Sequence, residues 1–407
     1  MPVSLFWRVV HRAAQNVLYL GLFLLPWQRP QLLKGKGALK QLPAFIKGKR
    51  LRHALLVTDS ALMRLGLANG FLEQMKAVGV KVSVYKDVTP NPTVAQAEEA
   101  CSLYRAQQCD HIIAFGGGSP IDCAKVVGAR VVRPRTSVQR LRGLFRVLWP
   151  LPPLFAVPTT AGTGSECTLA AVIVDGVTHE KSALMDPFLV PHYAVLDPCL
   201  TTGLPTFITA TTGIDTLTHG VEAFLNLNQV RQTEEDARKA VRLVFQHLRR
   251  AYDDGTDMVA REGMQEAAYL GGLACTRACV GNVHALAHQL GGLYNVPHGY
   301  ANGVLLPHVL ELYGPAVHSR LAQLADYVGV AGGSTAEKAQ ALIRAIKEMN
   351  AHMQIPETFA GDPHFSILDR DIPLMVSRAL AEVNPLYPVP VIFGPEEMTA
   401  LLKQVQA

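Results

Sequence analysis

From about Gly35 to Val195, short apolar or β-branched runs alternate with stretches of helical periodicity. This alternation is typical of a doubly wound α/β domain, in which helices cover both faces of a mostly parallel sheet. The runs predict six strands, at Ala54–Thr58, Val82–Tyr85, His111–Phe115, Leu154–Val157, Val172–Asp175 and Ala194–Leu196. Such sheets bind their ligands beyond the carboxyl ends of the strands, so the turns after these strands are candidate binding elements.

After Leu204–Pro205 the pattern changes, because strand-like runs vanish and long helical segments continue nearly to the end of the chain. We therefore predict a dinucleotide-binding α/β domain over 31–205 and a helical domain over 206–407. Residues 1–30 form an apolar N-terminal extension to these two domains.

The N-terminal extension carries the apolar run 17–26, preceded by Arg8 and Arg12. The run is shorter than the roughly 20 apolar residues that span a bilayer. Trp27 and the polar residues after it do not resemble a cleavage site, so we expect neither a spanning helix nor a cleaved signal. Two interpretations remain: an interfacial helix that rests on a membrane, or a helix packed on its own protein or on a partner subunit. The second is favoured, because apolar stripes are more often buried in protein.

The composition excludes some classes of protein. Hydrophobic residues make up 49% and charged residues 17% of the 407 positions, which is too apolar for a disordered chain. The net charge of +5 is small for this length and gives little support to general nucleic-acid binding. Seven cysteines, an odd number with no dense framework, indicate free thiols and a reducing, cytoplasmic environment.

The positive charge is unevenly distributed along the chain. Between Asp122 and Glu166 there is no acidic residue, but there are seven basic ones: Lys125, Arg130, Arg133, Arg135, Arg140, Arg142 and Arg146. Together with residues 1–30 they could form one face on an anionic bilayer, although a basic segment is more often a solvated surface.

A cluster of glycines follows the predicted strand His111–Phe115, at Gly116, Gly117 and Gly118. Glycines let the backbone approach a bulky anion, and the sequence Ser119-Pro120-Ile121-Asp122 is typical of a capped helix start. Because a helix start offers free N–H groups, this turn is a candidate diphosphate site. A glycine cluster alone could equally be a structural turn.

A second polar turn follows the strand Leu154–Val157 and contains Thr159, Thr160 and Thr163. Two such turns on one sheet favour a nucleotide ligand. Asp59, at the end of the strand Ala54–Thr58, can accept hydrogen bonds from a ribose 2′-hydroxyl and would repel a 2′-phosphate, which favours NAD over NADP. It can also cap a helix, and the sequence allows both roles at once.

The helical half holds several ligand-type residues at helical spacing. Asp215 and His219 are four residues apart, as are His284 and His288, and His298 follows in a Pro-His-Gly turn. Residues four apart share one face of a helix, and one carboxylate with several imidazoles suits divalent iron or zinc. The spacing leaves all five as candidates, since a metal needs no more than four or five of them.

Four motifs together resemble the iron-containing alcohol dehydrogenase family, group III of the alcohol dehydrogenases. They are GGGSPIDCAK (116–125), PTTAGTGSE (158–166), GIDTLTHGVEAF (213–224) and HALAHQLGGLYNVPHG (284–299). The resemblance covers the chain from about Gln31 to its end. It implies a Rossmann-like N-terminal domain, an all-α C-terminal metal-binding domain, as in dehydroquinate synthase and the iron-dependent alcohol dehydrogenases, and a homo-oligomer.

By position in these motifs, the resemblance assigns the metal, Fe2+ or else Zn2+, to Asp215, His219, His284 and His298. His288 is then left as a catalytic proton relay near the nicotinamide. The resemblance also assigns NAD to His288 and to Asp59, Asn91, Gly116, Gly117, Gly118, Ser119, Asp122, Thr159, Thr160, Thr163 and Lys181.

The expected reaction is hydride transfer between an alcohol and NAD, with the metal acting as a Lewis acid on the alcohol oxygen. The segment 274–280 and Ala170 depart from the family pattern and make a small diol less expected than a simple alcohol or aldehyde. Two other functions stay open: a dehydroquinate-synthase-like lyase, and a non-catalytic binding protein. The lyase would need several Lys or Arg residues near the metal motifs, where only Arg277 occurs.

Overall fold

The computed structural model describes residues 5–23, 27–176, 181–227 and 230–407. The chain divides into two compact units, which we describe separately. One contains residues 26–204 and 255–272, and we call it the sheet unit. The other contains residues 1–25, 205–254 and 273–407, and we call it the helical unit. The predicted domain boundaries after residues 30 and 205 remain a prediction.

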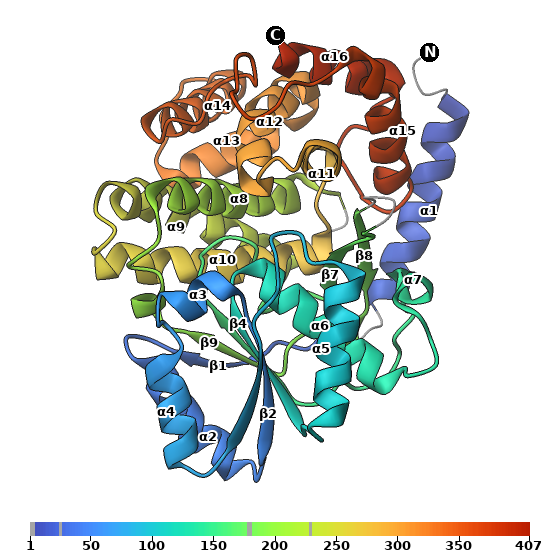
Figure 1. The fold of residues 1–407 in the computed structure, drawn as a ribbon. Helices are drawn as coiled ribbons and strands as arrows, with labels where there is room; N and C mark the ends of the chain where they lie inside the picture. The colour runs from blue at the N-terminus through green and yellow to red at the C-terminus, as the bar shows by residue number, and fades with distance from the viewer. Residues whose placement is uncertain (1–4, 24–26, 177–180, 228–229) are drawn as a thin grey trace. The chain divides into compact units, whose positions relative to one another are not determined.

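The sheet unit is built on six parallel strands in the order β1-β9-β6-β4-β2-β3. The strands are β1 (Gln31–Lys34), β2 (His53–Val57), β3 (Lys81–Tyr85), β4 (His111–Gly116), β6 (Leu154–Pro158) and β9 (Tyr193–Leu196). Its helices are α2 (Leu42–Gly48), α3 (Ser60–Arg64), α4 (Asn69–Ala77), α5 (Val94–Ala106), α6 (Gly118–Val132) and α7 (Val138–Leu141) (Figure 1). The predicted parallel sheet is therefore confirmed, and β1 is an additional edge strand that the pattern did not reveal.

Both faces of this sheet are buried, as the alternation of side chains along β4 shows. Ile112 and Ala114 belong to one hydrophobic cluster, together with Ala100 of α5 and Val127 of α6. Ile113 and Phe115 belong to a second cluster, with residues of α2 and α4. Successive side chains of a strand point to opposite faces, so each layer of helices closes one core.

The predicted strand at Val172–Asp175 exists, but it does not belong to the parallel sheet. It forms β7 (Ala170–Val174) of a separate three-stranded sheet, where it pairs antiparallel with β8 (Lys181–Met185). The third strand is β5 (Gly143–Leu144), parallel to β8. Periodicity alone does not distinguish an antiparallel partner from a parallel one, which is why the sequence did not separate the two sheets.

In the described part of the helical unit no strand occurs, as predicted. Its helices are α1 (Leu5–Phe23), α8 (Thr206–Leu225), α9 (Arg231–Asp253), α11 (Asn282–Tyr294), α12 (His298–Tyr313), α13 (Pro315–Val328), α14 (Thr335–His352), α15 (Ile372–Val383) and α16 (Pro395–Gln406). Helix α10 (Met258–Ala278) has residues in both units. From residue 209 to its end, α8 is buried on nearly every side, and it packs against α9 and α12.

Candidate metal centre and nucleotide turns

Asp215 and His219 lie one turn apart on the buried helix α8, where they are 2% and 7% exposed. Burial of a carboxylate and an imidazole in a helix core is costly unless each has a polar partner. Their partners come from the N-terminal ends of two further helices, α11 and α12.

Helix α12 begins at His298 and approaches α8 closely because of Gly299. A Cβ atom at position 299 would lie 2.0 Å from the carbonyl oxygen of Thr211, which no side chain could tolerate. The glycine therefore brings His298 against the face of α8 that carries Asp215. The Pro-His-Gly turn thus allows two helices to approach closely and also supplies a candidate metal ligand.

Three of the predicted ligands form a tight group. Oδ1 of Asp215 lies 3.6 Å from Nε2 of His284 and 3.5 Å from Nε2 of His298. The ligand-type atoms of all three residues lie within 4.8 Å of one another. First-row metals bind such atoms at about 2.0–2.2 Å, so the group can close around one ion after small side-chain shifts.

His219, the fourth predicted ligand, lies beside this group. Its ring stacks on that of His284 at a centroid distance of 4.6 Å. Its buried Nδ1 makes no hydrogen bond to the described residues, which is unusual for an imidazole in a protein core. The donor set of one carboxylate and neighbouring imidazoles therefore fits a divalent ion such as Fe2+.

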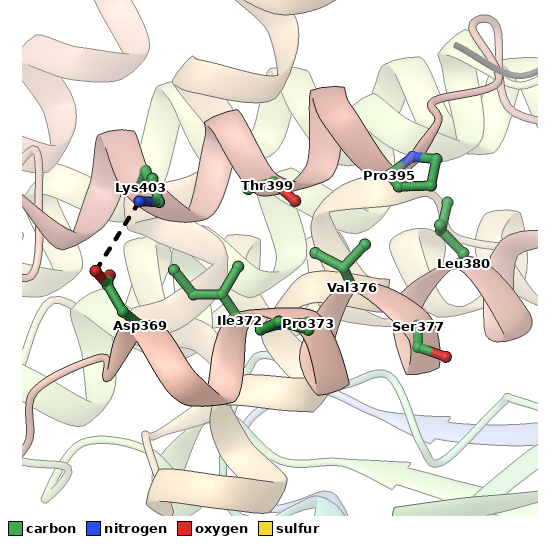
Figure 2. A pocket seen from close by; sticks show the side chains of 9 residues that line it. All are labelled: Asp369, Ile372, Pro373, Val376, Ser377, Leu380, Pro395, Thr399 and Lys403. Atoms are coloured by element: carbon green, nitrogen blue, oxygen red, sulfur yellow. Dashed lines mark ion pairs between the residues drawn. The ribbon is translucent and has the colours of Figure 1, made fainter. Parts of the chain in front are cut away.

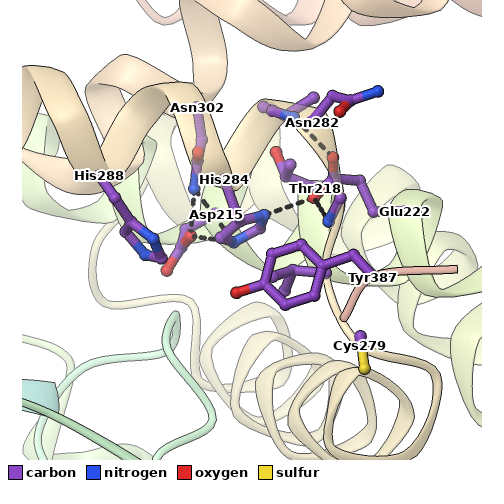
Figure 3. Close-up of polar contacts among 12 residues, drawn as sticks. Asp215, Thr218, Glu222, Cys279, Asn282, His284, His288, Asn302 and Tyr387 are labelled. Atoms are coloured by element: carbon purple, nitrogen blue, oxygen red, sulfur yellow. Dashed lines mark hydrogen bonds and ion pairs between the residues drawn. The ribbon is translucent and has the colours of Figure 1, made fainter. Parts of the chain in front are cut away.

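Glu222 orients His284 from behind, although the sequence reasoning did not single it out. Its buried carboxylate lies 2.6 Å from Nδ1 of His284 and accepts hydrogen bonds from the backbone N–H groups of Gly281 and Val283, each 2.8 Å away (Figure 3). A proton on Nδ1 leaves Nε2 available to a metal, which is how outer-shell carboxylates fix a histidine ligand. Glu222 is seven residues after Asp215, so two helical turns place it on the same face.

Asn302 was also missed, although it lies one helical turn after His298 on α12. Its Nδ2 donates to Oδ1 of Asp215 at 2.7 Å and lies 3.3 Å from Nε2 of His284 and 3.2 Å from Nε2 of His298 (Figure 3). The amide thus faces the same three atoms that would bind a metal. It keeps them converged by hydrogen bonding.

The electrostatics of the group follow from its burial and its charges. Burial alone would raise the pKa of Asp215, but the imidazoles of His219, His298 and His284 outweigh it and hold this pKa well below its usual range. Burial would lower the pKa of His284, but hydrogen bonds to Asp215 and Glu222 prevail and raise it to about 9. Burial lowers the pKa of His219 to about 4. A metal at Nε2 of His284 therefore has to displace a proton.

His288 lies next to the ligand group but has a different carboxylate partner. Its ring stacks on His298 at a centroid distance of 5.1 Å, and its Nδ1 lies 2.7 Å from Oε1 of Glu382 on α15. The same oxygen accepts a hydrogen bond of 2.9 Å from the hydroxyl of Tyr387. Neither Glu382 nor Tyr387 was predicted, since each is far from His288 in sequence and nothing in the local pattern indicates the contact.

In the sheet unit, the two predicted turns lie together, because the strands before them are neighbours: Gly116 of β4 is paired with Pro158 of β6. A Cβ atom at Gly117 would lie 3.3 Å from the Thr160 side chain, and one at Gly118 would lie 2.7 Å from that of Thr163. The glycines thus make room for the threonines, and α6 begins directly beside them. This arrangement fits a diphosphate at a helix N-terminus.

The predicted cap of α6 is wrong in detail. The capping position is Gly117, without a side-chain hydrogen bond, and Ser119 and Pro120 lie inside the first turn. Asp122 accepts hydrogen bonds from the Ser165 hydroxyl at 2.5 Å and from the backbone N–H of Val172 at 3.0 Å. Its carboxylate therefore ties the threonine turn to β7.

The remaining predicted cofactor residues have varied surroundings. Asp59 caps α3, because its Oδ1 accepts a hydrogen bond of 2.9 Å from the backbone N–H of Leu62. Asn91, which lies between two prolines, has a positive φ of 57°, and Lys181 is the first residue of β8, paired with Val174. The buried Thr159 donates its backbone N–H to the carbonyl oxygen of Gly116.

The predicted basic face is present only in part, because Arg135, Arg140 and Arg146 are exposed but other basic residues of the stretch are withdrawn from the surface. Lys125 is fully buried and donates to the carbonyl oxygens of Thr168 and Ala170, at 2.9 and 2.7 Å. Arg130 is 9% exposed and pairs with Glu98. Arg142 pairs with Asp175 at 3.2 Å. Internal carbonyls and acids from outside the acid-free stretch neutralise these side chains, which could not be read from local charge counting. All seven cysteines are free thiols, as predicted.

A groove of about 510 Å³ between α15 and α16 offers less chemistry than the ligand group. Its charged lining residues, Asp369 and Lys403, are 3.9 Å apart and both well exposed (Figure 2). The rest of its lining is mostly apolar. We therefore place the active site at the ligand group rather than in this groove.

A doubly wound sheet with two nucleotide-type turns, and a buried group of one carboxylate and neighbouring imidazoles, are typical of enzymes that use a metal ion and a nucleotide cofactor. Sequence comparison narrows this class. Residues 30–198 match the family described as "Iron-containing alcohol dehydrogenase", and residues 209–406 match "Fe-containing alcohol dehydrogenase family, C-terminal". This chain belongs to the iron-containing alcohol dehydrogenase family.

Individual relatives agree with this assignment. The 1,3-propanediol dehydrogenase of Klebsiella pneumoniae is 36% identical over 87% of this chain and 91% of its own length. The lactaldehyde reductase of Escherichia coli K12 is 33% identical, over 86% of this chain and 91% of its own. A crystal structure of a 1,3-propanediol oxidoreductase is similar with a TM-score of 0.89 and 34% identity, over 94% of this chain and all of that one.

These findings confirm the predicted family, fold class and enzyme class: an NAD-linked oxidoreductase of alcohols and aldehydes that uses Fe2+. The individual assignments of ligand and cofactor residues stay proposals. In the described part of the chain, no helix combines the length and hydropathy needed to cross a bilayer.

Proposed function

We propose that this enzyme interconverts a simple alcohol and its aldehyde, with Asp215, His219, His284 and His298 as the metal ligands and His288 as the proton relay. The observation that carries this proposal is a pair of histidine–carboxylate contacts, of which the first is buried and the second partly exposed. Glu222 fixes His284, a ligand, and Glu382 fixes His288, which is free for proton transfer.

When bound, Fe2+ supplies Lewis-acid chemistry and NAD supplies the hydride acceptor. The protein's own part is positioning and proton transfer. Glu222 holds Nδ1 of His284 so that its Nε2 faces Asp215, and Asn302 keeps these two residues and His298 converged. Glu382 holds Nδ1 of His288, which leaves the other nitrogen of that ring to pass a proton between substrate and solvent.

In the sheet unit, we assign the cofactor diphosphate to the start of α6. The residues proposed to bind NAD are Asp59, Asn91, Gly116, Gly117, Gly118, Ser119, Asp122, Thr159, Thr160, Thr163 and Lys181, and His288 completes the set beside the nicotinamide. Asp59 supports NAD over NADP, because its carboxylate would repel a 2′-phosphate while it caps α3.

The proposed activity is tested with the purified, Fe2+-loaded protein and a panel of substrates, followed by the absorbance of NADH. The panel contains simple alcohols and aldehydes, 1,3-propanediol and lactaldehyde, because relatives carry the names of the last two. Metal- and NAD-dependent turnover highest with a simple alcohol or aldehyde supports the proposal. Highest turnover with a diol overturns the substrate part. No hydride transfer with any of them favours the lyase or binding-protein alternative.

We also propose that the protein is a homo-oligomer in which α1 contributes an apolar surface. Phe6, Trp7, Val9 and Val17 are 68%, 54%, 60% and 69% exposed, which is unusual for residues of this kind on one helix. The alternative partner of this apolar surface is a membrane. Peripheral membrane contact through residues 1–30 stays a prediction, as does a cytoplasmic location. Oligomerisation is favoured, because Arg8 and Arg12 lie half-buried and do not join the exposed apolar face.

Light scattering of the protein and of a Val9→Ser/Val17→Ser variant distinguishes these outcomes. A smaller oligomer for the variant supports a subunit contact. An unchanged oligomer whose sedimentation with anionic liposomes is lost in the variant supports the membrane contact instead.

A further inference from the structure

Helix α1 packs on the helical unit with its polar face inward. Gln15 is 2% exposed, whereas Val17 and Trp7 are more than half exposed. The inward side of the helix carries Arg8, His11, Arg12 and Gln15 beside the half-buried Leu18, whereas the larger apolar residues Phe6, Trp7, Val9, Val10 and Val17 are exposed. An amphipathic helix normally buries its apolar face, so something other than hydrophobic burial holds α1 in this orientation.

The inward polar groups make specific hydrogen bonds to one segment near the end of the chain. Nε2 of Gln15 donates to the carbonyl oxygen of Tyr387 at 2.7 Å, and Nη2 of Arg12 donates to that of Pro390 at 3.0 Å. Nη1 of Arg12 also donates to Oε1 of Gln15 at 2.8 Å, which locks the two side chains together. A buried amide is stable only with such partners, so these bonds fix the position of α1 on the segment.

The segment that α1 holds leads directly to the active site. The hydroxyl of Tyr387 donates to Oε1 of Glu382, and the same oxygen is the partner of Nδ1 of His288. Tyr387 is thus held by α1 through its carbonyl group and holds Glu382 through its side chain. Tyr387 and His288 are both labelled in Figure 3.

Helix α1 lies outside the part of the chain that matches the family. The family matches cover residues 30–198 and 209–406, so α1 lies outside them, whereas His288, Glu382 and Tyr387 lie inside. The contact therefore joins an element outside the family match to residues inside it.

We propose that α1 is a brace for the active site: Gln15 and Arg12 are positioning residues that hold Tyr387, and through it Glu382, so that the imidazole of His288 keeps its catalytic orientation. The proposal rests on the role of His288 under the proposed function. It assigns to the N-terminal extension an effect on turnover rather than on metal or cofactor binding.

The test replaces Gln15 by Leu, which keeps the size of the side chain and removes the donor. The matched control is Asn16→Leu, which removes the neighbouring amide from the exposed side of the same helix. Since outer-shell partners typically contribute about 10-fold or more, we expect kcat of Gln15→Leu to fall about 10-fold with KM, bound iron and NADH affinity unchanged. Asn16→Leu should match the unmodified protein. An unchanged kcat in Gln15→Leu overturns the brace.

A double-mutant cycle separates the brace from a general loss of stability. Tyr387→Phe breaks the bond to Glu382 but leaves the carbonyl that α1 holds. If α1 acts through Tyr387, Gln15→Leu should cost little more once Tyr387 is Phe. Independent, multiplicative losses would overturn the proposed route. Hydrogen exchange of the segment 384–391 provides a readout without catalysis, since faster exchange is expected in Gln15→Leu and not in Asn16→Leu.

Failure of the brace can be distinguished from failure of the proposed function. If His288→Ala keeps full turnover, His288 is no relay, and the proposed function is wrong at that residue. If His288→Ala loses turnover while Gln15→Leu keeps it and the segment 384–391 stays protected, the brace alone is wrong. With both proposals correct, Gln15→Leu has no further effect on the residual turnover of His288→Ala.

Discussion

The metal group and the nucleotide turns use their residues in opposite ways. In the helical unit, chemistry lies in side chains, and a surrounding layer of Glu222, Glu382 and Asn302 orients them. In the sheet unit, the candidate diphosphate site consists of backbone N–H groups at the start of α6, and the buried Lys125 serves the fold through hydrogen bonds to backbone carbonyls. We therefore expect a single side-chain change to abolish activity when it falls in the metal group, and mainly to disturb packing when it falls in the nucleotide turns.

The largest expected effect is at the metal group itself. Asp215→Ala or His284→Ala should abolish bound iron and lower turnover by more than about 100-fold, because each removes a proposed ligand. The same loss of metal is expected for His219→Ala and His298→Ala. Elemental analysis of the purified variants measures this, with the half-buried His318→Ala as a histidine control outside the group.

His288→Ala separates a proton relay from a metal ligand, because this variant should keep its iron and lose turnover. An iron-free His288→Ala protein together with an iron-replete His298→Ala protein would reverse the assignment of ligand and relay.

A smaller effect is expected for Gly118→Ala in the nucleotide turns. The new Cβ would meet the Thr163 side chain, at 2.7 Å from its Cγ2, so the turn has to shift. Overpacking of this kind typically costs about 1–3 kcal/mol. We expect a lower melting temperature together with weaker NADH binding by fluorescence titration, and normal iron content. Gly70→Ala, in α4 with open space around its Cα, is the control and should change neither NADH binding nor iron. Full NADH affinity in Gly118→Ala would argue against a diphosphate at this turn.

Substitution of Asp59 should have a weaker effect, on the preference for NAD over NADP. Asp59→Ser removes the charge but keeps a side-chain oxygen for the cap of α3, so it isolates the electrostatic role better than Asp59→Gly. Like-charge repulsion of the order of 1 kcal/mol corresponds to a change of about 5-fold in the ratio of kcat/KM for NAD and NADP. Both variants should narrow the preference for NAD. An unmodified enzyme that favours NADP would contradict the assignment.

The smallest effect on activity is expected at Glu166, where a substitution should change stability alone. Burial in the sheet unit raises the pKa of Glu166 from 4.5 to about 7. The folded state therefore binds more protons than the unfolded state between these values, so this group makes stability fall as pH rises through that window. Glu166→Gln should remove this pH dependence of stability. Between pH 5 and pH 8 its free energy of unfolding should therefore rise, relative to that of the unmodified protein, by on the order of 1–3 kcal/mol. Denaturant unfolding at the two pH values measures this. Parallel pH profiles for the two proteins would show that Glu166 is charged in the fold.

The sequence predicted those parts of the fold and site that local spacing controls. The strands after which Gly116 and Thr159 follow were located within a residue or two, and the four-residue spacing of Asp215 and His219 placed both on one helix. Glycines that need room and ligands one turn apart are local properties, so they are visible without a structure.

Contacts between distant segments could not be predicted in this way. Glu382 is 94 residues from His288, and no periodicity links them. The internal partners of Lys125 lie more than 40 residues away, so local charge counting could not reveal that this residue is withdrawn from the basic surface. The inward polar face of α1 reverses the usual rule of amphipathic helices, because its partners are backbone carbonyls near the opposite end of the chain.

Those carbonyls have a consequence for how the N-terminal helix could vary in evolution or be engineered. Prolines lack an N–H group, so the segment 385–390, with its three prolines, has more acceptors than donors of its own. A main-chain acceptor is present whatever side chain accompanies it. The side chain of residue 390 can therefore change without loss of the bond from Arg12, whereas Gln15 and Arg12 have to remain donors. The side chains that determine this attachment therefore all belong to α1. An α1 helix fused to a relative with the same proline-rich turn would need only these two side chains to bind there.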